Sequence, residues 1–299
     1  MAAGRCVGVR PAYRAGNMRA GVVGAGLMGA EIALVFALAG HDVLLHDRDE
    51  KALAGAGGRL RAILDKGVAR QFYDPGHASA ALARIGQAQK VSGLADCGIV
   101  TEAVYEAIEV KAAVLRALDE ACGPHCIIAS NTSTMPISTL ASFVSPERRA
   151  RFLGTHYFSP VSRMKLVEVV PAFTTDPVVA DQVTGILEGI GKQPVRIKDV
   201  AGFAVNRMLH AMLIEAVKLV EEGVASPADL DTACRLGLGH PIGPFAMMDA
   251  VTSDLCLQVQ EILHDAYGER FRPPALLKQR VVAGFGGGRG RPGWLEKNA

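Results

Sequence analysis

Two residues of the segment GTHYFSPVSRMKLVEVV could do acid–base chemistry together. His156 stands between a small residue and two aromatic residues, and Glu168 follows twelve residues later inside the apolar run KLVEVV. The alternation of apolar and polar residues around Glu168 predicts a strand. An imidazole is the usual base near neutral pH, and a carboxylate bonded to its other nitrogen fixes its tautomer and stabilises the imidazolium. The pair is therefore a candidate general base with its orienting carboxylate.

The residue types alone leave a second interpretation of His156 open. A histidine beside aromatic residues is more often a hydrogen-bonded core residue than a catalytic one. An isolated glutamate inside an apolar strand is costly to bury without a partner, which favours the pairing of Glu168 with His156. Beside a hydride-accepting cofactor, such a pair would serve alcohol oxidation, because a base must take the hydroxyl proton as hydride leaves carbon.

A glycine motif near the start of the chain predicts a dinucleotide site. A short apolar strand, residues 20–23, runs into Gly24-x-Gly26-x-x-Gly29, and an apolar helix follows until Gly40. The first glycine allows the tight turn, the second lets the backbone approach a pyrophosphate, and the third lets helix and strand pack closely. The helix N-terminus offers unpaired N–H groups to phosphate.

The strand that comes next, DVLLHD, ends in Asp47, 18 residues after the last glycine of the motif. A carboxylate there can accept from both ribose hydroxyls and repels a 2′-phosphate, so the sequence predicts NAD rather than NADP as cofactor. Arg48, directly after Asp47, weakens the exclusion of NADP. A glycine-rich turn without a ligand is the alternative for the whole motif.

The order of the remaining patterns predicts an α/β fold. Helices over residues 50–90 precede three strand-and-turn segments, which end in EAVYE, SNTS and HYFSP. Alternating strands and helices imply a doubly wound, mostly parallel sheet of Rossmann type, whose carboxyl edge binds ligands. The pattern then becomes helical, with one long helix expected from about residue 199 and another capped by Ser226 and Pro227. We therefore predict a flexible N-terminal extension (1–17), an NAD-binding domain (18–198) and an all-α substrate and dimerisation domain (199–299).

Composition excludes several classes of protein. The 299 residues carry a net charge of +2, which gives no case for nucleic acid, and no apolar run is long enough for a membrane span. The six cysteines form no disulfide framework, which predicts a reducing, cytoplasmic location. Cys122, His125 and Cys126 have no second ligand pair at a zinc-site spacing, so we predict a helix-to-strand turn there and no metal.

Several motifs, taken in order, resemble one enzyme family. The runs GAGLMG, TEAVYE, SNTS, HYFSPV, MKLVEVV, GFAVNR and GLGHPIGPFAMMD look like the L-3-hydroxyacyl-CoA dehydrogenase family, which includes bacterial 3-hydroxybutyryl-CoA dehydrogenases, and they cover about residues 18 to 295. The resemblance implies an NAD domain, a helical domain that makes a homodimer, and an acyl-CoA substrate. It also implies interconversion of (S)-3-hydroxyacyl-CoA and 3-oxoacyl-CoA.

The resemblance also assigns roles to single residues. His156 matches the catalytic histidine and Glu168 its paired glutamate, while Ser133 and Asn206 match residues near the substrate hydroxyl and thioester carbonyl. Arg70 matches a basic residue that meets the CoA phosphate in relatives. For Ser133 and Asn206 the alternative is a turn or cap role, and for Arg70 a solvated helix face. The implied cofactor contacts are Gly24, Gly26, Leu27, Met28, Gly29, Asp47, Glu106, Lys111, Ser133, Ser159 and Arg289.

Two departures from the family pattern concern the cofactor side. Ser159 stands where many members have Asn, and Arg289 stands in a glycine-rich tail where a Lys is usual. Ser is also found at position 159 in the multifunctional fatty-acid-oxidation relatives, and the tail supplies no acid–base group, so we expect activity to survive. Two rival functions stay open: a dehydrogenase of free sugar acids, as in the gulonate dehydrogenase and lambda-crystallin branch, and a non-catalytic NAD-binding protein.

Overall fold

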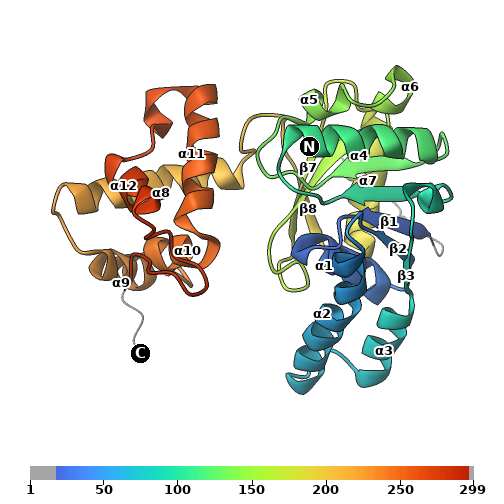
Figure 1. Ribbon diagram of the computed structural model, residues 1–299, viewed down its shortest axis with the longest axis horizontal. Helices are drawn as coiled ribbons and strands as arrows, with labels where there is room; N and C mark the ends of the chain where they lie inside the picture. Colours follow the sequence, from blue (N-terminus) through green and yellow to red (C-terminus); the bar gives the residue numbers. More distant parts are fainter. Residues whose placement is uncertain (1–17, 296–299) are drawn as a thin grey trace, which may run out of the picture. The chain divides into compact units, whose positions relative to one another are not determined.

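The computed structural model describes residues 18–295, which form two compact units (Figure 1). The first unit ends at Asp199 and the second begins at Val200. The predicted N-terminal extension, residues 1–17, lies outside the described residues.

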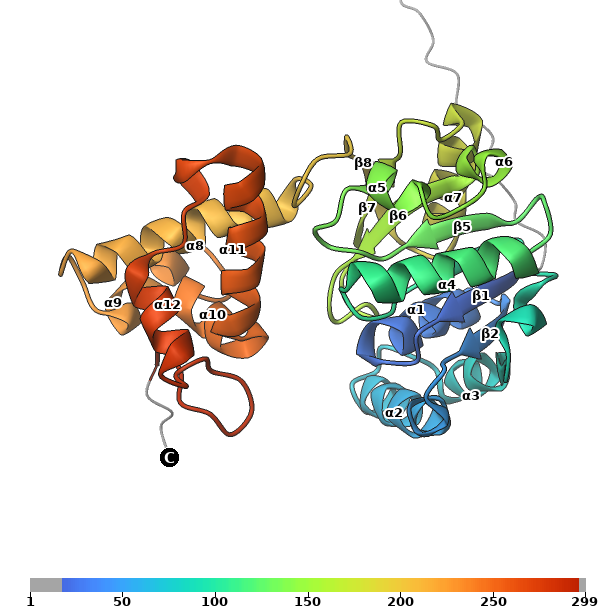
Figure 2. The same cartoon turned by 45° about the horizontal axis from the view of Figure 1, so that its top comes forward.

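The first unit is built on one eight-stranded sheet (Figure 2). Its strand order is β3-β2-β1-β4-β5-β6-β7-β8, and every neighbouring pair is parallel except β6 and β7. The strands are β1 (Arg19–Val23), β2 (Asp42–His46), β3 (Ile85–Gln87), β4 (Ile99–Glu102), β5 (Ile127–Ser130), β6 (Phe152–Tyr157), β7 (Leu166–Pro171) and β8 (Gln193–Arg196). The prediction of a doubly wound, mostly parallel sheet is confirmed.

The edge strands β3 and β8 were not predicted. Both are short and have no fully buried residue, so they lack the continuous apolar run of a central parallel strand. The turn predicted at Cys122 to Cys126 is confirmed, since it joins a helix ending at Ala121 to β5.

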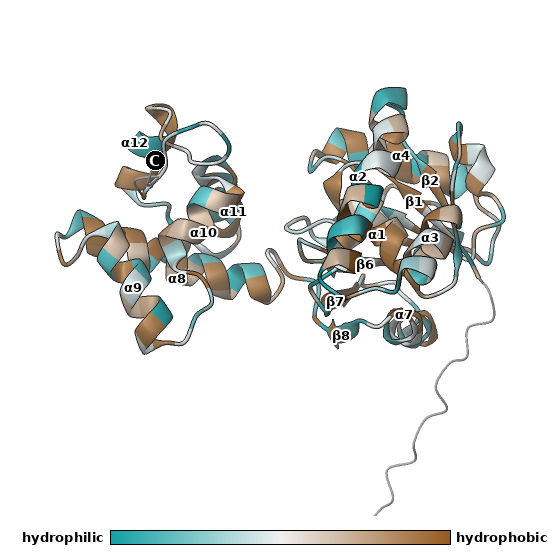
Figure 3. Cartoon of the chain, turned by 90° about the horizontal axis from the view of Figure 1, so that it is seen from below, coloured by the Kyte–Doolittle hydropathy of each residue, from teal (hydrophilic) through white to brown (hydrophobic). Residues whose placement is uncertain are grey.

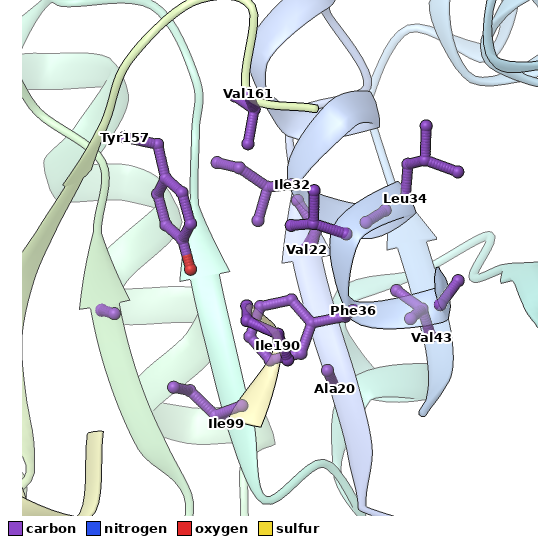
Figure 4. Close-up of a cluster of buried hydrophobic side chains, with 14 of the residues drawn as sticks. Ala20, Val22, Ile32, Leu34, Phe36, Val43, Ile99, Tyr157, Val161 and Ile190 are labelled. Carbon is purple, nitrogen blue, oxygen red and sulfur yellow. The ribbon is translucent and has the colours of Figure 1, made fainter. Parts of the chain in front are cut away.

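Helices cover both faces of this sheet. On one face α1 (Leu27–Leu38) and α7 (Pro177–Gly189) share a core with alternate strand residues, among them Val22, Ile99 and Tyr157 (Figure 4). The helices α2 (Glu50–Ala69) and α3 (Pro75–Ala83) pack on the outer side of α1. The other face carries α4 (Ile108–Ala121) and the short α5 (Ile137–Ala141); the first unit also contains η1 (Val91–Leu94) and α6 (Pro146–Arg149).

Helix α1 is buried on all sides over most of its length. The sequence predicts an amphipathic helix, but residues 29–37 are all buried, because the sheet lies on one side and α2 and α3 lie on the other. Glu31 is among these buried residues and is the one charged side chain of the helix. A carboxylate in such a place needs a hydrogen-bond partner.

The second unit is all helical. Its elements are α8 (Val205–Glu221), α9 (Pro227–Gly237), α10 (Pro244–Val251), α11 (Ser253–Tyr267), η2 (Glu269–Phe271) and α12 (Ala275–Val282). Leu213 and Val217 of α8 pack with Phe245, Met248 and Trp294 in one core. Helices α8 and α9 carry both apolar and polar residues, which Figure 3 shows in brown and teal along each helix.

The start of α8 differs from the sequence expectation. The long helix expected from about residue 199 begins only at Val205. Gly202 and Phe203 have φ of +67° and +46°, a left-handed conformation that an α-helix cannot include. The predicted cap of α9 is confirmed, because the Ser226 side chain accepts from the Asp229 N–H. Across residues 18–295, no helix is both long enough and apolar enough to cross a membrane.

Candidate active site

His156 and Glu168 face each other across a pair of antiparallel strands. His156 lies on β6 and Glu168 on β7, and the register places them directly opposite. Opposite residues of an antiparallel pair have Cβ atoms about 5 Å apart, on the same face of the sheet. The twelve-residue spacing therefore has a simple cause, since a hairpin whose two strands pair in this register brings these two side chains together.

The two side chains form a buried hydrogen bond. Nδ1 of His156 lies 2.7 Å from Oε2 of Glu168, and the residues are 6% and 1% exposed. An ionised carboxylate only accepts, so Nδ1 donates and Nε2 is the nitrogen that can take up a proton. The imidazole also packs on Phe158, with ring centroids 4.4 Å apart. This is the arrangement of a base held in one tautomer.

The glycine motif forms a tight turn between β1 and α1. Gly24 has φ of +103°, and a Cβ there would lie 2.4 Å from the Ala103 carbonyl oxygen. A Cβ on Gly29 would lie 1.8 Å from the Gly24 carbonyl oxygen, so both positions require glycine. A Cβ on Gly26 would meet nothing within 4 Å, and no side chain caps α1 there. Open space above an uncapped helix N-terminus fits a pyrophosphate.

Asp47 and Arg59 hold this turn in place. One carboxylate oxygen of Asp47 accepts from the Ala25 N–H at 2.6 Å, and the other accepts from the Asp49 N–H at 2.9 Å. The guanidinium of Arg59, on α2, donates to the Ala25 carbonyl. The sequence singled out Asp47 but not Arg59, whose position on a charged helix face gave no signal.

Glu106 organises the SNTS turn after β5. Its Oε1 accepts from the Ser133 N–H at 2.9 Å, from the Thr134 N–H at 3.3 Å, and from the Thr132 hydroxyl. Burial opposes ionisation of this carboxyl, but the charge of Lys111 and these hydrogen bonds outweigh it and hold the pKa of Glu106 below its ordinary value. Ser133 is thus fixed by a carboxylate that approaches from the preceding turn.

Lys111 lies between two carboxylates rather than at the surface. Its Nζ is 2.8 Å from Oε1 of Glu102 and 3.2 Å from Oε2 of Glu106, and the Lys111 and Glu102 side chains are essentially inaccessible. Ser130 donates to the second oxygen of Glu102 at 2.6 Å. Sequence reasoning gave Glu102 no role, although a glutamate at the end of a buried apolar strand is a signal for such a network.

The remaining candidate residues lie on other elements of the two units. In the first unit, Leu27 is exposed and Met28 half-buried in the first turn of α1, Ser159 is exposed on the loop after β6, and Arg70 is exposed at the end of α2. In the second unit, Asn206 lies in the first turn of α8 and Arg289 is exposed in the tail. The described structure therefore brings His156 to Glu168 and Ser133 to Glu106.

Comparison with known proteins identifies the relatives of the chain. The model of the 3-hydroxyacyl-CoA dehydrogenase NAD-binding domain matches residues 19–200, and that of the 3-hydroxyacyl-CoA dehydrogenase C-terminal domain matches residues 202–297. A 3-hydroxybutyryl-CoA dehydrogenase of Bradyrhizobium diazoefficiens is 35% identical over 93% of this chain and 94% of its own length. The mitochondrial hydroxyacyl-coenzyme A dehydrogenase of Sus scrofa is 38% identical over 89% of this chain and 87% of its own length.

A solved structure agrees with these matches. The crystal structure of (S)-3-hydroxybutyryl-CoA dehydrogenase from Ralstonia eutropha has a TM-score of 0.90 to this chain, with 34% identity, and covers 95% of this chain and 100% of its own. The matched NAD-binding domain and the open glycine turn make NAD the cofactor. The chain belongs to the 3-hydroxyacyl-CoA dehydrogenase family.

Proposed function

We propose that this enzyme oxidises (S)-3-hydroxyacyl-CoA to 3-oxoacyl-CoA, with His156 as general base and Glu168 as its orienting carboxylate. The observation that carries the proposal is the buried 2.7 Å hydrogen bond between His156 Nδ1 and Glu168 Oε2. In this arrangement Nε2 takes the hydroxyl proton, and the negative charge of Glu168 stabilises the imidazolium that forms. In the reducing direction Nε2 returns the proton to the carbonyl oxygen.

NAD, when bound, accepts the hydride that leaves C3 of the substrate. The residues proposed to hold it are the glycine turn with Leu27 and Met28, Asp47 beside the ribose, and Glu106, Lys111, Ser159 and Arg289 at further contacts. The fixed position of Ser133 supports a role for its hydroxyl near the substrate oxygen, since a turn held by Glu106 places that group without reorganisation.

We also propose roles for the two domains predicted from the sequence. Residues 18–198 bind NAD, and residues 199–299 contribute Asn206 to the substrate carbonyl and form the contact between subunits. Arg70 is proposed to meet a phosphate of CoA, which its exposure permits.

The test follows the loss of NADH absorbance with acetoacetyl-CoA as substrate, repeated with NADPH and with free acetoacetate. We expect fast turnover with NADH that requires the CoA moiety. Activity on free acids but not on the CoA ester would instead support the sugar-acid branch. Tight NADH binding without turnover on any acyl chain length would support a non-catalytic NAD-binding protein.

A homodimer through the helical unit and a cytoplasmic location complete the proposal. The support for the dimer is a set of exposed apolar side chains on the second unit: Met208, Val224, Leu236, Leu238 and Val282. Sedimentation velocity tests the homodimer, and a monomer at micromolar concentration would contradict it.

The cytoplasmic location rests on the scattered cysteines of the sequence alone.

A further inference from the structure

The loop between β6 and β7, residues 158–165, follows directly on the strand that carries His156. It also carries Ser159, a proposed cofactor contact. Two residues distant in sequence, Glu31 and Lys192, reach this loop from other elements. The question is what these two charged groups do there.

Glu31 binds the loop from the cofactor helix. It lies on α1, is 4% exposed, and its Oε2 accepts from the Ser162 N–H at 2.8 Å. The same helix begins at Leu27, directly after Gly26 of the glycine turn and four residues before Glu31. The hydrogen bond between Glu31 and Ser162 therefore links the helix whose N-terminus receives the pyrophosphate to the loop that follows His156.

Lys192 binds the loop from a second element. It lies between α7 and β8, is 7% exposed, and its Nζ donates to the carbonyl oxygens of Val161 and, at 2.9 Å, of Met164. Burial lowers the pKa of Lys192, while the negative charge of Glu31 acts in the opposite direction. Both an N–H and two carbonyls of one loop are thus satisfied by buried, oppositely charged side chains.

Packing alone does not fix this loop. Val161 is buried in the same apolar core as Ile32 of α1 (Figure 4). An open pocket of about 380 Å³ also borders the loop and is lined in part by Tyr73, Arg163 and Lys165. A loop that borders an open pocket depends more on its hydrogen bonds than one packed on all sides.

We propose that Glu31 and Lys192 are positioning residues that hold the loop, and with it Ser159 and the end of the His156 strand, in a fixed place relative to the cofactor helix. Neither residue touches the reacting atoms. Their effect is on how the cofactor is held against the base, where a displacement of about 1 Å can cost much of the rate. The roles of Ser159 and His156 in this inference rest on the proposed function.

The experiment compares Glu31→Gln with Glu31→Met. The two side chains have similar size, but only Gln keeps an oxygen that can accept from the Ser162 N–H. We expect Met to raise the KM for NADH and the Kd for NADH about 10-fold and to lower kcat, the scale of a lost hydrogen bond to a charged group, whereas Gln stays within about 3-fold of wild type. Lys192→Met should change the same constants in the same direction.

The matched control is Asp181→Asn on α7. Asp181 also forms an ion pair, 2.9 Å from Arg196, but its side chain is half exposed and its partner Arg196 lies on β8. We expect it to leave KM and kcat unchanged. Circular dichroism and thermal unfolding of all variants show whether they are folded, and NADH binding by fluorescence gives a readout that needs no substrate.

Two outcomes would overturn this inference. One is wild-type NADH affinity and turnover in a folded Glu31→Met variant. The other is an equal loss in Gln and Met, which would mean that the hydrogen bond to Ser162 is not the feature that matters. Both are distinct from failure of the proposed function, in which the wild-type enzyme itself does not turn over acetoacetyl-CoA.

Discussion

Two buried histidines, one in each unit, have different surroundings. His156 on β6 is 6% exposed and its Nδ1 is hydrogen-bonded to Glu168. His210 on α8 is 4% exposed, and within residues 18–295 its Nδ1 has no hydrogen-bond partner. Burial lowers the pKa of His210 to about 4, because a charged imidazole loses its hydration there without gaining a counter-charge.

The comparison shows that burial alone keeps a histidine neutral. A buried imidazole can act as a base only if something stabilises the charge that it acquires. In the first unit the antiparallel register of β6 and β7 supplies a carboxylate for this purpose. Each prediction below changes one side of this comparison.

The largest effect is expected from His156→Ala. Removing a general base should lower kcat by at least about 10²-fold while the protein stays folded. The matched control is His210→Leu, which removes a buried histidine of the second unit and should leave kcat unchanged near neutral pH. Steady-state kinetics with acetoacetyl-CoA and NADH measure both, and wild-type turnover in His156→Ala would refute the assignment of the base.

Glu168→Gln removes the negative charge that lies beside His156, so that this imidazole, like that of His210, lacks such a counter-charge. The imidazole stays buried but loses the charge that stabilises its protonated form, so we expect kcat to fall about 10-fold to 10²-fold with a smaller change in KM. The pH–rate profile of the variant should also differ from that of the wild type. A profile identical to that of the wild type would show that the carboxylate does not act on the imidazole.

Glu106→Gln tests a carboxylate that holds a backbone turn, whereas Glu168 holds an imidazole ring. Gln keeps an acceptor for the Ser133 N–H but loses the charge that faces Lys111. We expect kcat/KM to fall about 10-fold, since Lys111 then balances Glu102 alone and the turn loses a charge-assisted hydrogen bond. Glu109→Gln, an exposed acid on α4, is the control. Equal kinetics in the two variants would mean that the charge of Glu106 is dispensable.

The parts of the site that local pattern determines could be predicted from the sequence. The glycine spacing, the acid after the second strand and the pairing of His156 with Glu168 all depend on short segments whose geometry is regular. A strand pair in register places opposite side chains at a fixed distance, so the residue types and the strand pattern favour the pairing, and the family resemblance assigns the two roles. The edge strands β3 and β8 could not be predicted, because their short segments lack a buried apolar run.

The residues that hold the turns could not be predicted in the same way. Glu31 meets Ser162 across 131 positions of sequence, and Lys192 meets Met164 across 28. Such contacts arise only when the sheet brings separate elements together, and no local period encodes them. The signal that the sequence did offer was an isolated charge in an apolar helix, as at Glu31, which is costly to bury unless it has a partner.

The smallest effect concerns the stability of the second unit in acid. The pKa of His210 is about 4 in the folded protein and about 6.5 when unfolded, so the unfolded chain takes up the proton first as the pH falls. The stability associated with neutral His210 is therefore fully present above about pH 6.5, declines as the pH falls and levels off near pH 4. Between about pH 7 and about pH 5 this group alone should remove about 2 kcal/mol of the free energy of unfolding.

The single tryptophan of the chain reports on this transition. Trp294 packs on Phe245 in the core of the second unit, with ring centroids 5.1 Å apart, so its fluorescence in urea follows the unfolding of that unit. The pH dependence of its unfolding free energy should be shallower in His210→Leu than in the wild type by the amount that His210 contributes. Equal slopes would mean that His210 takes up its proton as readily in the folded unit as in the unfolded chain. The contrast between the two histidines would then be confined to their hydrogen-bond partners.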